Sequence, residues 1–522
     1  MANHAPVIES GPVIETAAGR LRGTQAGGIH AFKGIPYGAS TAGANRFLPP
    51  RPAVPWAGVR EALSYHAQAP QAPRAKRRSE LEFLLGPSDA TPESEDCLTL
   101  NVWSPGLDRA KRPVMVWLHG GAFAYGSSNR AFSDGANLAR RGDVVVVSVN
   151  HRLNIFGFLD LGEIGGEHFA QSGNAGVLDL LAALEWVRDN IAAFGGDPAN
   201  VTIFGESGGG GKVSVLMAMP AARGLFHRAI VQSGAGVRMR TRERGLALTA
   251  AVLDHLGISR GEWERLQQVS VRALLEAIAP ASRAIGPTRW KLLDRYDFGP
   301  VVDGEILPQQ PFDPDAPAIA DDIPLMIGGT RDESALFLAD DDAWWRRQLN
   351  EGDVRGRIAA IAGDEADALI AAYRRARPKA TAAQLLVAVL TGGNFWIRSV
   401  LLAERKAMRR GAPVHMYSLD WGTPVHDGRL GAHHAIDVAF VFDTVDVPQA
   451  TAAMPGAREL AARMSATWAA FARHGTPDNA AIPHWPAYTE SERATMIFDT
   501  ECRIDRDPGR DARLLWSRVA TR

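Results

Sequence analysis

Short, nearly continuous hydrophobic segments recur along the chain between residues that break regular structure. Examples are PVMVWLHGG from Pro113 and DVVVVSVNHR from Asp143. Further segments of this kind begin at Asn200, Ala229, Ile323, Pro413 and Ala494. Strands that are covered on both faces have no polar face, so they read as continuous rather than alternating hydrophobic segments. The segments therefore predict a buried, mostly parallel sheet.

Helical periodicity appears between the predicted strands. From Gly173 to Gly195, hydrophobic residues recur at the spacing of one helix face, and a Gly-Gly pair then ends the pattern. The segment VSVLMAM also predicts a helix. Two longer, helix-rich and more polar stretches lie at about 236–295 and 335–405, and strands resume after each. We therefore predict one doubly wound α/β catalytic domain over residues 1–522, in which the two stretches are insertions that cover the sheet and its site.

Composition and charge narrow the class of protein. The 522 residues include 57 Lys and Arg against 58 Asp and Glu, so no basic field typical of nucleic-acid binding is present. The densest basic run, residues 74–78, reads as a solvated loop. No segment approaches the roughly 18 apolar residues of a membrane span, and the N-terminal pattern is not that of a signal peptide. We expect a cytoplasmic protein without a nucleic-acid partner or membrane span, either a monomer or a weak homo-oligomer.

The segment TIFGESGGGGK, residues 202–212, allows two interpretations with unrelated functions. A phosphate-binding loop needs Gly, four residues, and then Gly-Lys followed by Ser or Thr. Counted back from Lys212, the first glycine falls on Glu206, whose carboxylate would repel phosphate. The position that needs a hydroxyl is Val213. The phosphate-loop interpretation is therefore rejected.

The same segment fits a nucleophilic serine held on a sharp turn. Its Gly-Glu-Ser-Gly-Gly lies between a β-branched strand and an apolar helix, the context in which Gly-x-Ser-x-Gly predicts a nucleophile. The turn imposes unfavourable backbone angles on Ser207, and small neighbours let the strand and the helix approach. A glycine-rich turn with an incidental serine is the alternative that the pentapeptide alone leaves open.

A second glycine-rich segment, LHGGAFAYGSS from Leu118, follows a predicted strand. Its glycines let backbone N–H groups point into a cavity, where they could bind the oxyanion that forms when serine attacks an ester carbonyl. We assign this role to the amides of Gly121 and Ala122, together with that of Gly208 after the serine. A loop glycine pair without such a role is the alternative.

A serine hydroxyl needs a base to accept its proton, and histidine suits this role near neutral pH. The α/β-hydrolase chain order is serine, acid and then histidine, which selects His433 and His434 in LGAHHAIDVAFVFDT as candidates. The acid is expected on a loop after a strand, where IGGTRDESALF offers Asp332 and Glu333. The residues alone leave both pairs open.

Three further motifs occur in order along the chain: SEDCLTLNVW, GNAGVLDLLAALEWVRDNIAAFGGDPANVTIFGESGGG and HAIDVAFVF. With them, and from FKGIPYG to WPAYT, the sequence resembles the type-B carboxylesterase/cholinesterase family, and within it the bacterial para-nitrobenzyl-esterase-like members. The resemblance implies an α/β-hydrolase fold and a serine carboxylesterase that forms an acyl-enzyme without a metal or cofactor. Its partner would be a small-molecule ester substrate.

The resemblance also assigns roles to individual residues. Ser207 is the nucleophile. Glu333 is preferred to Asp332 because the family's acid is the glutamate of an Asp-Glu pair after a strand. His434 is preferred to His433 because the family's histidine precedes an acidic-aromatic run. Together they would form a Ser-His-Glu triad with a backbone oxyanion hole.

Other positions follow from the same resemblance. Two structural ion pairs map onto Arg152 with Asp179 and Arg46 with Glu95. The chain departs from the family at Gly208, where alanine is usual, which predicts a looser turn whose amide still donates.

The substrate pocket is the least determined part of the site. Candidate lining residues are Phe123, Tyr125, Glu206 and Phe337. Aromatic residues of the insertions could line a gorge or pack the roof: Trp290, Phe298, Trp344 and Trp345. Three alternative functions remain, which are cleavage of carbamates or amides by the same triad, hydrolysis of long-chain lipids, and a non-catalytic binding protein.

Overall fold

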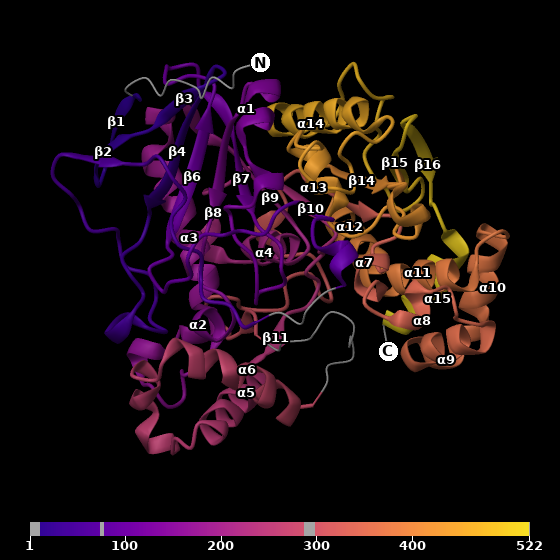
Figure 1. Cartoon of the computed structure of the whole chain (residues 1–522), viewed down its shortest axis with the longest axis horizontal. Helices are drawn as coiled ribbons and strands as arrows, with labels where there is room; N and C mark the ends of the chain where they lie inside the picture. The colour runs from indigo at the N-terminus through magenta and orange to yellow at the C-terminus, as the bar shows by residue number, and fades with distance from the viewer. Residues whose placement is uncertain (1–10, 74–77, 287–297, 521–522) are drawn as a thin grey trace.

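The computed structural model describes residues 11–73, 78–286 and 298–520, and within them eleven strands form the central sheet (Figure 1). Their order is β16-β15-β14-β13-β10-β9-β7-β8-β6-β4-β3. In chain order their bounds are β3 (Thr24–Ala26), β4 (Ile29–Pro36), β6 (Thr99–Ser104), β7 (Arg112–Leu118), β8 (Val145–Val149), β9 (Gly196–Glu206), β10 (Arg228–Gln232), β13 (Leu325–Thr330), β14 (Val414–Leu419), β15 (Ala494–Phe498) and β16 (Arg503–Arg506). From β8 through β7, β9, β10, β13 and β14 to β15, neighbours pair in parallel. The outer pairs are antiparallel.

The hydrophobic segments of the sequence form the parallel part of this sheet, as predicted. Every residue of β8, β13, β14 and β15 is buried. Because both faces are covered, these strands need no polar face, which explains their continuous hydrophobic sequences.

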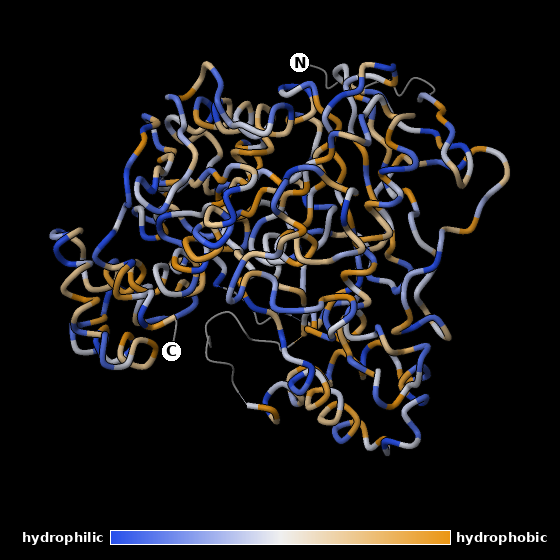
Figure 2. The backbone as a smooth tube through the Cα atoms, turned by 180° about the vertical axis from the view of Figure 1, so that it is seen from behind, coloured by the Kyte–Doolittle hydropathy of each residue, from blue (hydrophilic) through white to orange (hydrophobic). Residues whose placement is uncertain are grey.

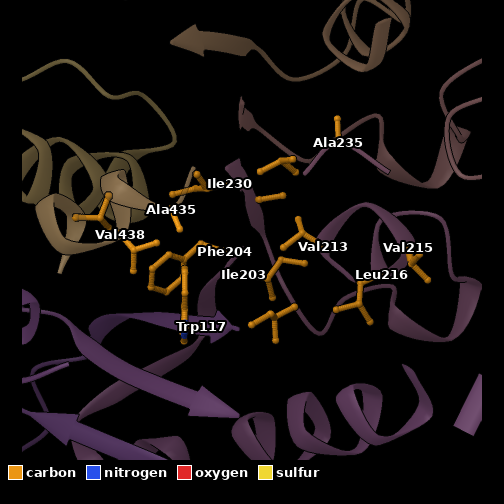
Figure 3. Packing of buried hydrophobic residues seen from close by; sticks show 14 of the residues in the cluster. Trp117, Ile203, Phe204, Val213, Val215, Leu216, Ile230, Ala235, Ala435 and Val438 are labelled. Carbon is orange, nitrogen blue, oxygen red and sulfur yellow. The ribbon is translucent and has the colours of Figure 1, made fainter. Parts of the chain in front are cut away.

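Helices cover the two faces of the sheet. On one face lie α3 (Ala175–Asn190) and α4 (Gly208–Leu216), and on the other lie α1 (Ala136–Gly142), α13 (Ile436–Val441) and α14 (Ala457–His474). Successive side chains of β9 point to opposite faces of the sheet, so they pack in turn against the two helix layers. Figure 3 shows Ile203 near Val213 of α4, whereas Phe204 lies beside Trp117 and faces Val438 of α13.

Two predicted helices are present, with one shifted boundary. The helix predicted between Gly173 and Gly195 is α3, followed by a short 3-10 helix that ends at Gly195 in the left-handed conformation. The helix predicted at VSVLMAM is α4, but it begins at Gly208, directly after the candidate serine. Glycine has a low helix propensity, so the sequence pattern hid this first turn.

Both helix-rich stretches are helical in their described residues. The first contains α5 (Arg242–His255) and α6 (Val271–Ala284), and the second contains α7 (Ala335–Leu338), α8 (Asp342–Trp345), α9 (Glu351–Ala362), α10 (Ala366–Ala376), α11 (Ala382–Thr391) and α12 (Ile397–Met408). Figure 1 shows α5 and α6 together at one edge of the molecule and α9 and α10 at another. Hydrophobic and hydrophilic residues are interspersed along the outer helices α5, α6, α9 and α10 (Figure 2), whose buried residues recur at helical spacing.

Smaller elements complete the described chain. A three-stranded sheet contains β1 (Val13–Thr16), β2 (Gly19–Arg22) and β5 (Val59–Glu61), and a two-stranded one contains β11 (Arg240–Thr241) and β12 (Val301–Val302). The remaining α-helices are α2 (Asn154–Phe158) and α15 (Arg510–Ala520).

One described helix is long and apolar enough to cross a membrane. It spans Ala382–Met408, where a π-helical turn joins α11 to α12. However, 83% of its most apolar window is buried inside the protein. The helix is therefore packed as a core helix.

Candidate active site

The candidate catalytic residues follow three different strands of the parallel sheet. The loop after β7 carries Gly121, β9 leads directly into Ser207, and the loop after β13 carries Glu333. Since parallel strands end at the same edge of a sheet, these segments meet there. His434 joins them from the turn before α13.

Ser207 has the strained backbone expected of a nucleophile on a sharp turn. Its φ is 56° and its ψ is −121°, and its amide donates a hydrogen bond to the carbonyl oxygen of Gln232 over 2.8 Å. A Cβ atom at Gly209 would lie 2.0 Å from the carbonyl oxygen of Leu118. Only glycine lets helix α4 start this close to β7, which explains the Gly-x-Ser-x-Gly pattern.

We call residues 119–123 the oxyanion loop, after the role that the sequence predicts for it. Gly121 and Ala122 have φ angles of 99° and 55°. The carbonyl oxygen of Gly121 accepts hydrogen bonds from the amides of Ala124 and Tyr125 and so closes a tight turn. Within the described residues, the amides of Gly121, Ala122 and Gly208 donate no hydrogen bond to the protein. These N–H groups are therefore unused by the fold.

Gly208 is not part of a looser turn. A Cβ atom there would lie 1.9 Å from the carbonyl oxygen of Ala122, so the oxyanion loop occupies the space that an alanine methyl would need. The expectation of a looser turn is wrong, because backbone of the loop fills the space of the missing side chain.

The structure brings His434 and Glu333 together. Nδ1 of His434 lies 2.5 Å from Oε2 of Glu333, and both side chains are buried. The other oxygen of Glu333 accepts a hydrogen bond from the amide of Thr330, which fixes the carboxylate on the strand end. A carboxylate at Nδ1 favours the tautomer that leaves Nε2 free to accept a proton.

The neighbouring residues of each pair have other partners. Oδ2 of Asp332 accepts a hydrogen bond from the amide of Ala432 and contacts Arg331, so this carboxylate braces the loop that carries the histidines. Nδ1 of His433 contacts the carbonyl oxygen of His434 rather than a carboxylate. Of these four residues, the structure joins Glu333 to His434 by a direct side-chain contact.

Two aromatic rings hold the imidazole of His434. The ring centroids of Phe337 and Phe395 lie 5.0 and 5.1 Å from that of the imidazole, and the two phenyl rings stack on each other. Phe337, predicted as pocket lining, therefore also orients the histidine. This packing limits the rotation of the ring about its side-chain bonds.

Carboxylates dominate the electrostatics around His434. Burial by itself lowers the pKa of this histidine, but the negative charges of Glu206 and Glu333 outweigh it and raise the pKa to about 9. Burial raises the pKa of Glu206 to about 8. The two buried groups compete for protons near neutral pH, so each changes the charge of the other.

Nε2 of His434 faces Glu206 in the structure. It lies 3.1 Å from Oε1 of Glu206, the residue before Ser207, and no described hydrogen bond joins Nε2 to the serine hydroxyl. The sequence predicts Glu206 only as pocket lining, so its contact with the imidazole is an addition. Catalytic hydrogen bonds are often poorly aligned before substrate binds.

A buried polar network behind the histidine was missing from the sequence prediction. Asp437 accepts hydrogen bonds from Gln232 over 2.9 Å and from the hydroxyl of Tyr417 over 3.0 Å. Burial raises the pKa of Asp437 to about 6. The one available signal is the acidic residue in HAIDVAFVF, because an aspartate inside a buried helix needs partners.

The two ion pairs predicted as structural are present. Arg152 and Asp179 are buried and joined by two side-chain hydrogen bonds of 2.9 and 2.6 Å. Arg46 and Glu95 form a bidentate pair with two contacts of 2.7 Å.

The predicted pocket aromatics lie in different surroundings. Phe123 packs edge-to-face on Phe158, with 5.5 Å between the ring centroids, and is partly exposed, as is Tyr125. Trp344 and Trp345 are buried within the helical stretch, and Phe298 is buried as well. Trp290 lies outside the described residues. Among the described residues, no group of three or more His, Cys, Asp or Glu side chains is arranged to hold a metal ion.

The sequence is similar to known proteins along its whole length. The model of the carboxylesterase family matches residues 10–513. The para-nitrobenzyl esterase of Bacillus subtilis (strain 168) is 37% identical over 504 residues, which cover 96% of this chain and 97% of that protein. The phenmedipham hydrolase of Pseudarthrobacter oxydans is 35% identical over 513 residues, with the same coverage.

Solved structures agree with the sequence comparison. A carboxylesterase of Geobacillus stearothermophilus superposes with a TM-score of 0.82 at 40% identity and covers 97% of this chain and 99% of its own. Together with the mostly parallel central sheet, these similarities establish the predicted α/β-hydrolase fold. The chain belongs to the carboxylesterase family and is a carboxylic ester hydrolase.

Proposed function

We propose that the chain hydrolyses small-molecule carboxylic esters in two steps, with Ser207, His434 and Glu333 as its catalytic triad. The observation that carries the proposal is the position of the imidazole. Nδ1 of His434 lies 2.5 Å from Glu333, and Nε2 points to the segment of Ser207, where it lies 3.1 Å from the adjacent Glu206. The contact with Glu333 and the position of Nε2 beside the residue before Ser207 support a base between this acid and the serine.

In the first step, the hydroxyl oxygen of Ser207 attacks the ester carbonyl while Nε2 of His434 accepts the hydroxyl proton. Glu333 stabilises the imidazolium that forms. The oxyanion is bound by the unused amides of Gly121, Ala122 and Gly208. One such donor contributes about 3–4 kcal/mol to transition-state stabilisation. The imidazolium then gives its proton to the departing alcohol, and an acyl-enzyme remains.

In the second step, a water molecule attacks the acyl-enzyme and His434 accepts one of its protons. Collapse of the second tetrahedral intermediate returns this proton to Ser207 and releases the carboxylic acid. Before the first step, Nε2 of His434 must exchange its contact with Glu206 for the serine hydroxyl.

A carbamate is the second candidate substrate class. The relative named phenmedipham hydrolase, 35% identical to this chain, favours it, because the same triad can transfer a carbamoyl group to serine. Rates on a matched ester, carbamate and anilide would rank the classes.

We further propose one catalytic domain in the cytoplasm, with the two helical stretches beside the substrate site.

Replacing the nucleophile tests the mechanism. Ser207→Ala removes the attacking oxygen, so hydrolysis of a chromogenic ester should fall by about 10⁶-fold in kcat. Circular dichroism and melting temperature should remain close to those of the parent protein. A variant that folds and retains full activity would exclude Ser207 as the nucleophile.

A further inference from the structure

Lys212 ends the segment that first suggested a phosphate loop, and the proposed hydrolysis gives it no role. It lies on α4 with its side chain fully buried. Burial lowers the pKa of its amine to about 7. Within residues 11–73, 78–286 and 298–520, no carboxylate lies within ion-pair distance of this amine.

The amine of Lys212 contacts both ends of the oxyanion loop. Its Nζ donates a hydrogen bond of 2.8 Å to the carbonyl oxygen of His119, the first residue of the loop. It also lies 5.9 Å from the ring centroid of Phe123, the last residue, where an ammonium is attracted to the face of the ring. Between these two contacts are the amides of Gly121 and Ala122.

The surroundings of Lys212 contain further titratable groups. His119 stacks on His151, with 5.1 Å between the ring centroids. Burial, followed by the nearby positive charge of Lys212, lowers the pKa of His151 well below its ordinary value. The neutral His151 therefore adds no positive charge next to Lys212.

Packing alone does not account for a lysine at this position. A buried ammonium without a counter-ion destabilises the folded state, because one hydrogen bond replaces only part of its lost hydration. Methionine has a side chain of similar length and would fill the space without that cost. The amine is explained if its hydrogen bond to the carbonyl oxygen of His119 holds the oxyanion loop in the geometry that the reaction needs.

We propose that Lys212 is a positioning residue for ester hydrolysis, whose hydrogen bond to the carbonyl oxygen of His119 holds the oxyanion loop against α4 and so fixes the amides of Gly121 and Ala122. This inference rests on the proposed function. The contact of Ala122 with Gly208 joins the same loop to the start of the same helix, so α4 holds the loop from two sides.

The test replaces the amine by an isosteric apolar side chain. Lys212→Met should lower kcat by about 10-fold or more, with KM changed by less than about threefold, because the loop amides that Lys212 positions act mainly on the oxyanion. A trifluoromethyl ketone forms a tetrahedral adduct with a negatively charged oxygen, so its inhibition constant should rise by the same factor as kcat falls. The variant should remain folded, because relief from burying the amine and loss of its hydrogen bond to His119 act in opposite directions on the melting temperature.

Lys406 provides a matched control. It is also fully buried, and its Nζ donates to the carbonyl oxygens of Asp321 and Ala412, which precede β13 and β14. Those carbonyls lie at the opposite edge of the sheet from the candidate site. Lys406→Met should therefore leave kcat, KM and inhibition by the ketone unchanged.

A fluorophosphonate probe separates failure of this inference from failure of the proposed function. Labelling of Ser207 in the parent protein supports the function, and absence of labelling overturns it together with the inference. If Ser207 is labelled but Lys212→Met keeps kcat and ketone inhibition within about twofold, the inference alone is overturned. It is likewise overturned if the Lys212 variant loses activity only in proportion to a lower melting temperature.

Discussion

At position 208, the absence of a side chain determines how closely the oxyanion loop approaches helix α4. Gly208→Ala would place a methyl group 1.9 Å from the carbonyl oxygen of Ala122, so the loop has to move. We expect kcat to fall by about 10- to 100-fold, because the displaced amides no longer point at the oxyanion. Steady-state kinetics on a chromogenic ester would measure the loss.

Gly211 offers the matched control on the same helix. A Cβ atom there meets the ring of Phe123 at 3.4 Å and the carbonyl oxygen of Gly234 at 3.8 Å, which are ordinary contacts. Gly211→Ala should therefore leave kcat within about threefold of the parent value. Equal losses in both alanine variants would contradict a specific contact at Gly208.

The pH dependence of the enzyme should report the carboxylates around His434. The base accepts a proton only when it is unprotonated, so kcat/KM should rise as the pH rises through its pKa. Glu206 and Glu333 raise that pKa to about 9, so the acidic limb should lie well above the ordinary histidine value of 6.5. Glu206→Gln removes a negative charge, lowers the pKa of His434 and should move this limb to lower pH.

Profiles of kcat/KM against pH for both proteins test this prediction. Glu264→Gln removes an exposed carboxylate elsewhere and should leave the profile in place. An acidic limb that stays fixed in the Glu206 variant, or that moves to higher pH, would show that Glu206 does not act on the catalytic base.

At the scale of elements, the buried ion pair between Arg152 and Asp179 joins the segment after β8 to helix α3. Both side chains are buried, and Asp179 also accepts a hydrogen bond from the backbone amide of Arg152. Asp179→Ala leaves a buried guanidinium without its partner, which typically lowers the free energy of unfolding by about 3–5 kcal/mol. Urea denaturation should show a correspondingly lower midpoint.

The same helix carries the control for this prediction. Asp189 pairs with Arg188, and these side chains are 50% and 51% exposed. Asp189→Ala should change the free energy of unfolding by about 0–1 kcal/mol, because water screens an exposed pair. Similar losses in both variants would mean that helix α3 is destabilised by alanine in general rather than by loss of the buried pair.

Elements with strong periodicity could be predicted from the sequence. The strands β7, β8 and β13 are continuous hydrophobic segments, and the hydrophobic residues of α3 recur at helical spacing, so local pattern and tertiary burial agree. The first turn of α4 could not be predicted, because its glycines are selected by contacts with Leu118 and Ala122 in a loop far away in the sequence. Tertiary packing overrides helix propensity there.

At the scale of the whole molecule, motifs located the candidate site but not its electrostatics. The Gly-x-Ser-x-Gly motif and the His-His pair identify candidate residues, but they do not show which residues lie next to them in the fold. The hydrogen bond between Gln232 and Asp437 joins residues 205 positions apart, and the contact of Glu206 with His434 also depends on how the sheet is assembled. Such pairs leave no signal in the local sequence. The same holds for the hydrogen bond from Lys212 to the carbonyl oxygen of His119.

The fit between Ala122 and Gly208 has a consequence for protein engineering. The two backbone segments fit each other closely. A graft of residues 118–128 from a homologue with alanine at position 208 would therefore bring in a loop whose curvature suits a bulkier residue. Chimeras that exchange both segments in one step should tolerate recombination, whereas those that exchange either segment alone should not. Crossover points for shuffling this chain with its relatives are therefore better placed outside both segments.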